Sequence, residues 1–432
     1  MPSVLIAGGG LVGCVNACLF AQKGWRVSVF ESRPDPRGKC LETGKSFNLA
    51  FGCRALDTLD RIGLNERVIE MGVAVREKMR WVGEDEGVLE RVQGLKDGDF
   101  VLTVNRQQLC ELLINEAEKY NNVEFLFNHK ATKFNVNSQK LLIERPDGSQ
   151  LTLDGDLILT CDGAHSSIRR SLLQVSGFDF AQRYCEIGYM DLSARPRRME
   201  FKLGVHYSWR KEGVILVALA NKNGVLTVSM FARFEVFDRI GKDPVDFFEK
   251  HFSQVFKTIG SDHILQTFAN DKPQPIISLE CSRHGFFDKL LLMGDSAHAM
   301  VPFQGQGANC GFEDCVVLQE VLESFENVKD VVREYCKMRT IDTNVMNRME
   351  WEGYLKLLET LKHPHEHLGW HQRLMSFLGF SNVFPSTFTR ATFSRERYSE
   401  IARTNQKTQE LLNIMIILLS TLLISTVILF VF

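Results

Sequence analysis

Short apolar runs separated by polar turns recur along most of the chain and alternate with segments of helical periodicity. Apolar runs of roughly four to eight residues bounded by turn signals are typical of buried strands, whereas apolar residues at every third or fourth position indicate amphipathic helices. The pattern predicts buried strands of one parallel sheet at 3–7, 26–30, 156–160 and 289–293. Helices are predicted at 54–71 and 105–120, the second capped by Asn105.

A second group of apolar runs has the pattern of antiparallel strands. The runs 213–220 and 225–231 flank Asn-Lys-Asn-Gly at 221–224, a strong hairpin signal. A helix is predicted beside them at 244–256. We therefore expect a separate, mostly antiparallel sheet, which can form one wall of a closed pocket.

The first strand leads directly into Gly-Gly-Gly-Leu-Val-Gly at 8–13, a helical pattern follows, and the second strand ends at Glu31. This is the order of a dinucleotide-binding βαβ unit. Gly8 would allow the tight turn, Gly10 the approach of a pyrophosphate to the helix N-terminus, and Gly13 the close packing of helix and strand. Glu31 can accept hydrogen bonds from ribose hydroxyls. The motif predicts dinucleotide binding without separating FAD from NAD.

Two later strands also end in an acidic residue beside glycine. The strand at 156–160 runs into Cys-Asp-Gly, with Asp162 at its end, and the strand at 289–293 runs into Gly-Asp, with Asp295 at its end. A loop rich in Gly and Pro then leads to a long helix near Ala308. Because ligands of open α/β sheets bind at the carboxyl ends of the strands, we expect both acids at the cofactor site. His298 could act as a base, but packing against the loop is at least as plausible an interpretation.

Composition narrows the classes of function. The formal net charge is −2, which gives no indication of a nucleic-acid partner. The 11 Cys residues include no Cys-x-x-Cys pair, as expected of buried thiols in a reducing compartment. The first strand is predicted to begin at Ser3, so we expect no secretory or mitochondrial presequence. Four His residues between 363 and 371 lack carboxylate or Cys partners at metal-ligand spacing beyond Glu366, so we predict no metal site.

The C-terminal segment 411–432 contains no charged residue and is nearly all Leu, Ile, Val and Phe. About 20 apolar residues span a bilayer as a helix. Arg403 and Lys407 precede the run, as expected on the cytosolic side of a membrane anchor. We therefore predict a tail anchor; a buried C-terminal helix is the alternative.

Three motifs together carry a resemblance: Gly-x-Gly-x-x-Gly with Glu31, Cys-Asp-Gly at 161–163, and Gly-Asp at 294–295 before Pro-x-x-Gly-x-Gly-x-Asn at 302–309. The chain resembles the single-component FAD-dependent aromatic hydroxylases, which share the para-hydroxybenzoate hydroxylase fold. Within that group the strings at 46–50, 298–303, 311–314 and 384–388 are similar to the kynurenine 3-monooxygenase family. The resemblance favours FAD over NAD and implies mitochondrial outer-membrane anchoring, with the catalytic part facing the cytosol. It places FAD-contacting positions, together with the motif residues, at Gly8, Gly10, Val12, Gly13, Glu31, Arg33, Ala50, Arg106, Asp162, Asp295, Gly307, Ala308 and Asn309.

The departures from that family fall on the substrate side. The family has two arginines where this chain has Arg76 and Lys78, and Lys loses the bidentate recognition of a carboxylate. A Tyr expected shortly after this strand is missing, since residues 81–119 contain none. Arg76, Lys78 and Arg80 can share one strand face. We predict that Arg76 and Lys78 bind the substrate; a solvated strand face is the alternative.

The predicted fold is α/β. A Rossmann-like FAD-binding domain (1–75, 101–180 and 285–325) carries an inserted, mostly antiparallel sheet (76–100 and 181–284), C-terminal helices (326–408) and a transmembrane anchor (411–432).

The predicted activity is an NADPH- and O2-dependent flavin monooxygenase that hydroxylates an aromatic ring, L-kynurenine to 3-hydroxykynurenine by resemblance. No side chain is predicted as a catalytic nucleophile, since the flavin supplies the chemistry. Two alternatives stay open: a hydroxylase of another aromatic substrate, such as a phenol or quinone precursor, and a membrane-anchored flavin-binding protein without hydroxylase activity.

Overall fold

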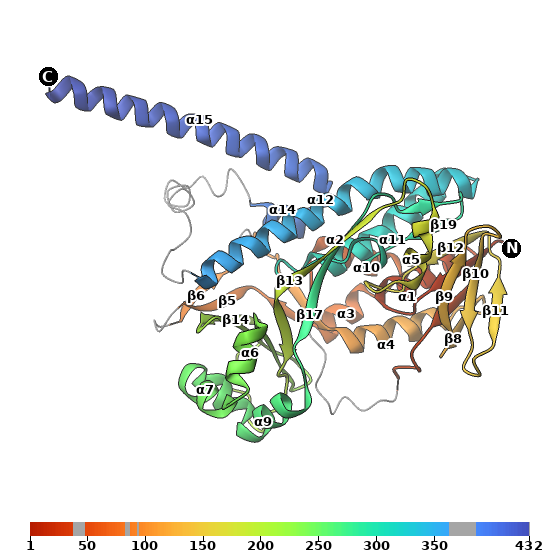
Figure 1. The fold of residues 1–432 in the computed structure, drawn as a ribbon, viewed down its shortest axis with the longest axis horizontal. Coiled ribbons are helices and arrows are strands. Elements are labelled where there is room, and N and C mark those ends of the chain that lie inside the picture. Colours follow the sequence, from red (N-terminus) through yellow and green to blue (C-terminus); the bar gives the residue numbers. More distant parts are fainter. Residues whose placement is uncertain (38–47, 83–86, 93–94, 363–385, 432) are drawn as a thin grey trace.

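The computed structural model describes residues 1–37, 48–82, 87–92, 95–362 and 386–431. Its first layer is a six-stranded sheet in the order β18-β19-β12-β1-β2-β8, in which all neighbours except β18 and β19 are parallel (Figure 1). The strands are short and apolar, as predicted. They are β1 (Ser3–Ala7), β2 (Arg26–Glu31), β8 (Val123–Phe127), β12 (Leu157–Thr160), β18 (Gly285–Phe286) and β19 (Leu290–Leu292).

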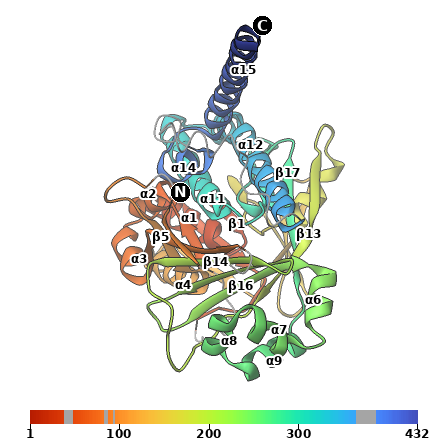
Figure 2. The same cartoon turned by 90° about the vertical axis from the view of Figure 1, so that its left-hand side faces the viewer.

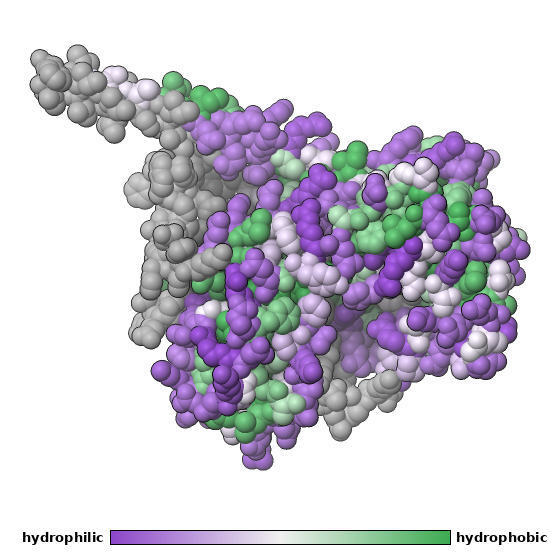
Figure 3. Space-filling view, in the orientation of Figure 1, coloured by the Kyte–Doolittle hydropathy of each residue, from purple (hydrophilic) through white to green (hydrophobic). Residues whose placement is uncertain are grey.

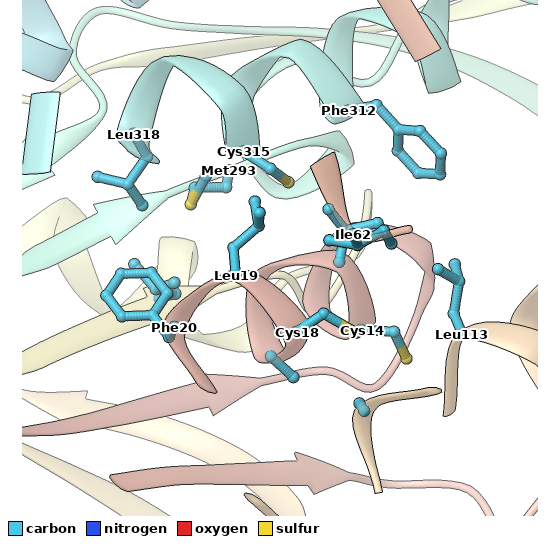
Figure 4. Packing of buried hydrophobic residues seen from close by; sticks show 14 of the residues in the cluster. Cys14, Cys18, Leu19, Phe20, Ile62, Leu113, Met293, Phe312, Cys315 and Leu318 are labelled. Atoms are coloured by element: carbon cyan, nitrogen blue, oxygen red, sulfur yellow. The ribbon is translucent and has the colours of Figure 1, made fainter. Parts of the chain in front are cut away.

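Helix α1 (Leu11–Gln22) is buried along most of its length between this sheet and two other helices, α4 (Arg106–Ala117) and α11 (Gln306–Ser324). Figure 4 shows Leu19 and Phe20 of α1 facing Met293, Cys315 and Leu318, with Leu113 of α4 near Cys14. The thiols of Cys14 and Cys18 are buried in this core, as the sequence suggested. The packing fixes α1, and with it the glycine turn at its start.

The second layer is a seven-stranded sheet in the order β17-β13-β16-β15-β14-β5-β6, antiparallel except for the β14–β5 pair. Four short helices cover one of its faces (Figure 2). The strands are β5 (Glu77–Val82), β6 (Val88–Arg91), β13 (Phe180–Asp191), β14 (Val205–Lys211), β15 (Val214–Ala220), β16 (Leu226–Arg233) and β17 (Gln274–Cys281). The helices are α6 (Phe234–Ile240), α7 (Pro244–His251), α8 (Ser253–Ile259) and α9 (Ser261–Asn270).

Two three-stranded sheets and several short helices complete the body. The sheet β3-β7-β4 contacts α4 and α11, and β11-β10-β9 packs beside the first sheet (Figure 1). Their strands are β3 (Asn48–Phe51), β4 (Val73–Val75), β7 (Val101–Asn105), β9 (Lys130–Asn135), β10 (Lys140–Glu144) and β11 (Gln150–Leu153). The short helices are α2 (Cys53–Arg61), α3 (Asn65–Met71), α5 (Ser167–Ser171) and α10 (Asp295–His298).

In the described part of the C-terminal region, the helices are α12 (Val328–Lys362), α14 (Thr387–Phe393) and α15 (Tyr398–Val431). Helix α12 packs against α11 and β17, and α15 begins against α12 and then projects away from the body (Figures 1 and 2). Among the described residues, no helix combines the length and the apolarity that crossing a membrane requires. The four His residues between 363 and 371 lie outside the described residues.

The predicted mixture of a parallel and a mostly antiparallel sheet is confirmed, and the hairpin at 221–224 joins β15 to β16. Asn105 caps α4 as predicted, since its side chain accepts hydrogen bonds from the backbone N–H groups of Gln107 and Gln108. The single helix predicted at 54–71 is wrong: α2 and α3 are separated at Gly63, whose φ of +71° a continuing helix cannot contain. The helix predicted at 244–256 is likewise two helices, divided at Phe252, which has φ −134° and ψ 46°.

Candidate active site

The glycine turn after β1 has a geometry that larger residues cannot adopt. Gly8 has a φ of +101°, and a Cβ there would lie 2.3 Å from the carbonyl oxygen of Cys161. A Cβ at Gly13 would lie 2.0 Å from the carbonyl oxygen of Gly8, because α1 begins directly against the turn. At Gly10, the N-cap of α1, a Cβ would have nothing within 4 Å. Open space therefore adjoins the unpaired N–H groups of the helix start, where a pyrophosphate binds in this type of unit.

Glu31 lies buried at the end of β2, beside this turn. One carboxylate oxygen accepts a hydrogen bond of 2.9 Å from the Gly9 backbone, and the other accepts from the backbone and side chain of Arg33 at 2.9 and 2.8 Å. Burial alone would raise the pKa of Glu31, but these hydrogen bonds outweigh it and hold the pKa below its ordinary value. An ionised acceptor is thus fixed beside the turn, with the exposed side chain of Arg33 next to it.

Asp162 lies directly against the glycine turn. Its Cα is 2.9 Å from the position that a Cβ on Gly8 would occupy. One carboxylate oxygen accepts from the Ser167 backbone at 3.1 Å, whereas Oδ1 is buried without a hydrogen-bond partner in the described structure. Burial raises the pKa of Asp162. A buried acceptor without a partner is rare in native proteins and is a feature that a bound cofactor would satisfy.

The third motif contacts the first at the side chain of Val12. A side-chain methyl of Val12 lies 2.9 Å from the Cβ positions that would be built on Gly294 and Gly311, so both glycines make room for α1. Asp295 is exposed at the start of α10. The buried guanidinium of Arg169 donates to the backbone of Ser296 at 2.8 Å and so joins the second motif to the third. The structure therefore brings together three segments that lie far apart in the sequence.

The loop that opens α11 is held by the side chain of Asn309. Its amide nitrogen donates to the carbonyl oxygens of Ala50 and Gly305, both at 2.8 Å, and its amide oxygen accepts from the backbone of Gly52 at 2.9 Å. Because these three backbone groups occupy the amide, the side chain of Asn309 positions the loop. A Cβ at Gly307 would have nothing within 4 Å, so open space lies at the start of this helix as well.

The same loop is held from the other side by Glu350 of α12, a buried residue that the sequence did not single out. Its two carboxylate oxygens accept hydrogen bonds of 3.1 Å from the backbone N–H groups of Gln304 and Gln306. Burial raises the pKa of Glu350 to about 8, although the two backbone hydrogen bonds act in the opposite direction. No sequence motif indicated this residue, because its role depends on where α12 packs.

His298 is a packed residue rather than an accessible base. It is buried, and its Nε2 lies 2.6 Å from Asp314, which also accepts from the Gly294 backbone at 2.9 Å. His298, Cys310 and Asp314 have the spacing of a metal site, but the guanidinium of Arg339 already contacts Asp314 at 2.8 Å and Cys310 at 3.3 Å. Burial would raise the pKa of Asp314, but the neighbouring charges of His298 and Arg339 hold it well below its usual range.

The seven-stranded sheet has two chemically different faces. Trp81, Trp209 and Met230 belong to the face covered by α6–α9. The opposite face, which we call the inner face, carries the alternating residues of the same strands. Phe231 of this face lies 5.6 Å from the ring of Phe303, which stacks on Tyr354 of α12 at 5.6 Å. The inner face therefore meets the loop that carries Phe303, and aromatic rings line the junction.

The inner face also carries polar groups at β5 and β14. Lys78 is paired across the strands with His206, and Arg80 with Ser208. Nδ1 of His206 and the hydroxyl of Ser208 are buried without hydrogen-bond partners in the part of the chain that the structure describes. Sequence reasoning singled out Lys78 but missed His206, Ser208 and Arg210. The sequence did carry one signal for them: these polar residues alternate with Tyr207 and Trp209, as expected of a strand with one polar and one apolar face.

Two further predicted cations are Arg76 and Arg106. Arg76 precedes β5, is exposed, and its guanidinium lies over the ring of Phe100 at 5.3 Å. Arg106 is the first residue of α4. The hydrogen bond with Cys14 lowers the pKa of the Cys110 thiol most, and the nearby charges of Arg106 and Arg33 lower it further. The structure thus places Arg106 on the glycine-turn side, and it places Arg76 two residues before Lys78 with its guanidinium over Phe100.

Comparison with known proteins agrees with this geometry. Residues 1–339 match the family model described as an FAD binding domain. The kynurenine 3-monooxygenase of Caenorhabditis elegans is 38% identical to the chain over 98% of its length and 96% of the relative's. The enzyme of that name from Sus scrofa is 33% identical over 97% and 90%.

Solved structures show the same fold. 2-Methyl-3-hydroxypyridine-5-carboxylic acid oxygenase matches with a TM-score of 0.67 at 19% identity, over 85% of this chain and 94% of that one. A tetracycline destructase matches with a TM-score of 0.62 at 14% identity, over 92% and 99%. The residues described above fit FAD: the glycine turn is open where the pyrophosphate would lie, and Asp162 has an acceptor free for it.

Proposed function

Because the chain belongs to the kynurenine 3-monooxygenase family, we propose that it hydroxylates the aromatic ring of L-kynurenine to give 3-hydroxykynurenine. The protein is an FAD-dependent monooxygenase, with NADPH as the source of electrons and O2 as the second substrate. One observation supports the proposal most strongly. The three segments proposed to bind the cofactor lie on one side of the site, and the inner face of the seven-stranded sheet, with its aromatic rings and cations, lies on the other.

FAD, when bound, supplies the redox chemistry that activates O2 at the expense of NADPH. The glycine turn and the start of α1 would hold its pyrophosphate, Glu31 its ribose, and Asp162, Asp295 and the backbone near Gly307 and Ala308 the remainder. The chain's own task is to orient the substrate ring and keep water away from it. Phe231, Phe303 and Tyr354 provide apolar walls for this, and Glu350 and Asn309 hold the loop between them.

A product assay tests this function. Purified protein with its flavin should consume NADPH faster when kynurenine is added, and mass spectrometry should find a product with one more oxygen atom. If a phenol or a quinone precursor is hydroxylated in place of kynurenine, the chemistry stands and the substrate is wrong. If no aromatic compound raises NADPH consumption, the protein is a flavin-binding protein without hydroxylase activity.

From the sequence of the segment 411–432, we also propose that the C-terminal end of the chain anchors the protein in the mitochondrial outer membrane, with the body in the cytosol. The segment 411–432 has no charged residue, and Leu411, Ile414 and Leu418 of α15 are exposed. Figure 3 shows hydrophilic residues at the base of α15 and hydrophobic ones beyond them. Full-length protein should pellet with mitochondria and resist an alkaline wash, whereas a chain ending at Gln409 should be released. Equal distribution of both chains would contradict the proposal.

A further inference from the structure

Two thiols from different helices meet at the backbone of the glycine turn. Cys14 lies near the start of α1 and Cys110 near the start of α4, and Figure 4 shows Cys14 beside Leu113 of α4. The sulfur of Cys14 is 3.3 Å and that of Cys110 is 3.8 Å from the same atom, the carbonyl oxygen of Gly9. The two thiols are also hydrogen-bonded to each other. The fold thus brings together two cysteines that lie far apart in the sequence.

The two thiols differ in exposure and in acidity. Cys14 is buried, whereas Cys110 is partly exposed. The hydrogen bond with Cys110 and burial both raise the pKa of Cys14. The pKa of Cys110 is lowered, most by the hydrogen bond with Cys14, and the charges of Arg106 and Arg33 act in the same direction against the effect of burial. A partly exposed thiol of lowered pKa beside a second thiol is the arrangement typical of redox-sensing cysteines.

The other thiols of the described chain lack this combination. The pKa of each of them is raised above its ordinary value, and burial contributes to every one of these shifts. Cys336 on α12 is partly exposed like Cys110, and Cys18 is buried one helical turn after Cys14. Burial raises the pKa of both Cys336 and Cys18 to about 12. These two residues are therefore matched comparisons for Cys110 and Cys14.

We propose that Cys14 and Cys110 are a peroxide-sensitive pair that forms a disulfide bond beside the FAD site. The oxidant is hydrogen peroxide, the product of O2 that has taken up two electrons without a substrate being hydroxylated. The sulfur of Cys110 attacks one oxygen of the peroxide, the O–O bond breaks, and hydroxide leaves, so that Cys110 becomes a sulfenic acid. The sulfur of Cys14 then attacks the sulfur of Cys110, the S–O bond breaks, and the S–S bond forms. Each released hydroxide takes up the proton of one thiol, so two thiols are oxidised and one peroxide is reduced to two molecules of water.

The disulfide bond changes the glycine turn because both sulfurs contact Gly9. An S–S bond is about 2.05 Å long, so α4 and α1 must approach each other. Neither sulfur can then donate a hydrogen bond to the Gly9 carbonyl. The N–H of Gly9 donates to Glu31 at 2.9 Å, and Arg106, the first residue of α4, moves with its helix. We expect the Kd for FAD to rise roughly tenfold in the oxidised protein. Thiol reductants of a reducing compartment would reverse the change.

The test uses the full-length protein with bound FAD, treated with hydrogen peroxide in the absence of NADPH and of any aromatic substrate. After the remaining thiols are alkylated, peptide mass spectrometry should find Cys14 linked to Cys110. Flavin fluorescence should show FAD released in parallel with the link. Dithiothreitol and fresh FAD should restore the bound flavin. Titration of the oxidised and the reduced protein with FAD gives the two Kd values, which should differ roughly tenfold.

Four variants assign the steps to single thiols. Cys110→Ala should keep its FAD in peroxide, because the first attack is lost. Cys14→Ala should stop at a sulfenic acid on Cys110, which dimedone labels. Cys18→Ala removes a buried thiol from the same helix and should behave as the wild type does. Thermal unfolding shows whether each variant folds, and Cys110→Ser replaces Cys110→Ala if the latter does not.

Two results would overturn the inference. One is the absence of a link between Cys14 and Cys110 in treated wild type, or oxidation of Cys336 before Cys110. The other is loss of FAD from treated Cys110→Ala as readily as from the wild type, since the disulfide bond would then not weaken binding. Neither result bears on the proposed hydroxylation, because the assay contains no aromatic substrate. A failure to hydroxylate kynurenine would in turn leave the thiol pair as it is.

Discussion

The two sides of the candidate active site differ in how their polar groups are used. On the cofactor side, the groups that shape the site are bound to each other: Asn309 makes three hydrogen bonds to backbone groups, and Glu31 accepts from Gly9 and Arg33. On the inner face of the sheet, His206 and Ser208 have buried atoms without partners in the described structure. The loops of the cofactor side are thus held in place by the fold, with Oδ1 of Asp162 left without a partner in the described structure, whereas on the inner face two neighbouring polar side chains lack partners there.

The largest expected effect is at the glycine turn. Gly13→Ala would place a methyl group 2.0 Å from the carbonyl oxygen of Gly8, and the backbone must move to remove the clash. We expect protein that is insoluble or destabilised by more than about 3 kcal/mol, and without bound FAD. The flavin absorbance per protein and thermal unfolding measure this.

Gly10→Ala is the matched control, because a Cβ there has nothing within 4 Å. It should fold normally and lose affinity for FAD alone, since the methyl group occupies the space for the pyrophosphate. Similar stability for Gly13→Ala and Gly10→Ala would show that the turn is less tightly packed than the distances indicate.

A smaller loss is expected when Asn309 is replaced by Ala. The substitution leaves the Gly52 N–H and the carbonyl oxygens of Ala50 and Gly305 without their partner in a buried place. Each such group costs about 1–3 kcal/mol, so a total loss of roughly 2–4 kcal/mol is expected in urea unfolding after partial relaxation. If water takes the place of the amide at little cost, the free energy of unfolding should fall by less than about 1 kcal/mol. That result would contradict the difference drawn here between the cofactor side and the inner face.

Glu350 lies between the two sides and should make stability depend on pH. Its pKa is about 8 in the folded protein and ordinary, near 4.5, in the unfolded chain. The unfolded chain therefore releases this proton at lower pH, and the stabilising contribution, complete below about pH 4.5, is lost as the pH rises through about 8. Relative to Glu350→Gln, which cannot titrate, the wild type should lose on the order of 2–4 kcal/mol across this range.

Urea unfolding of both proteins at several pH values measures the difference. Parallel curves for wild type and Glu350→Gln would mean that water or rearrangement of the loop relieves the buried charge. The same series with kynurenine present would show whether the loop at Gln304–Gln306 responds to the substrate.

The sequence predicted the cofactor side far better than the inner face, and the reason is the range of the interactions. Gly8, Gly13 and Glu31 act within one βαβ unit, whose residues are close in the chain and have fixed spacing. Asp162 and Asp295 could be placed because parallel strands of one sheet end at one edge. The division of the predicted 54–71 helix at Gly63 was missed because a glycine within an apolar periodic segment can either lie inside a continuous helix or end it.

The inner face could not be derived in the same way. Whether His206 and Arg210 point toward the core helices or toward the cofactor depends on which face α6–α9 cover, and that is a tertiary fact. Pairing of β14 with the distant β5 in parallel brings Lys78 to His206, and no local pattern encodes this register. The role of Glu350 could not be predicted for the same reason, since its hydrogen-bond partners Gln304 and Gln306 belong to another segment of the chain.

The smallest predicted effect on stability is at Ser208, on the inner face of the seven-stranded sheet. Ser208→Ala removes a buried hydroxyl that has no hydrogen-bond partner in the described structure. Because no bond is broken and a buried polar group is lost, the free energy of unfolding should stay within about 0.5 kcal/mol of the wild type or rise slightly. Asn309→Ala, also a buried polar residue near the site, should lose several times more. If Ser208→Ala is destabilised as much as Asn309→Ala, the hydroxyl is part of the fold and the inner face is not held open for a ligand.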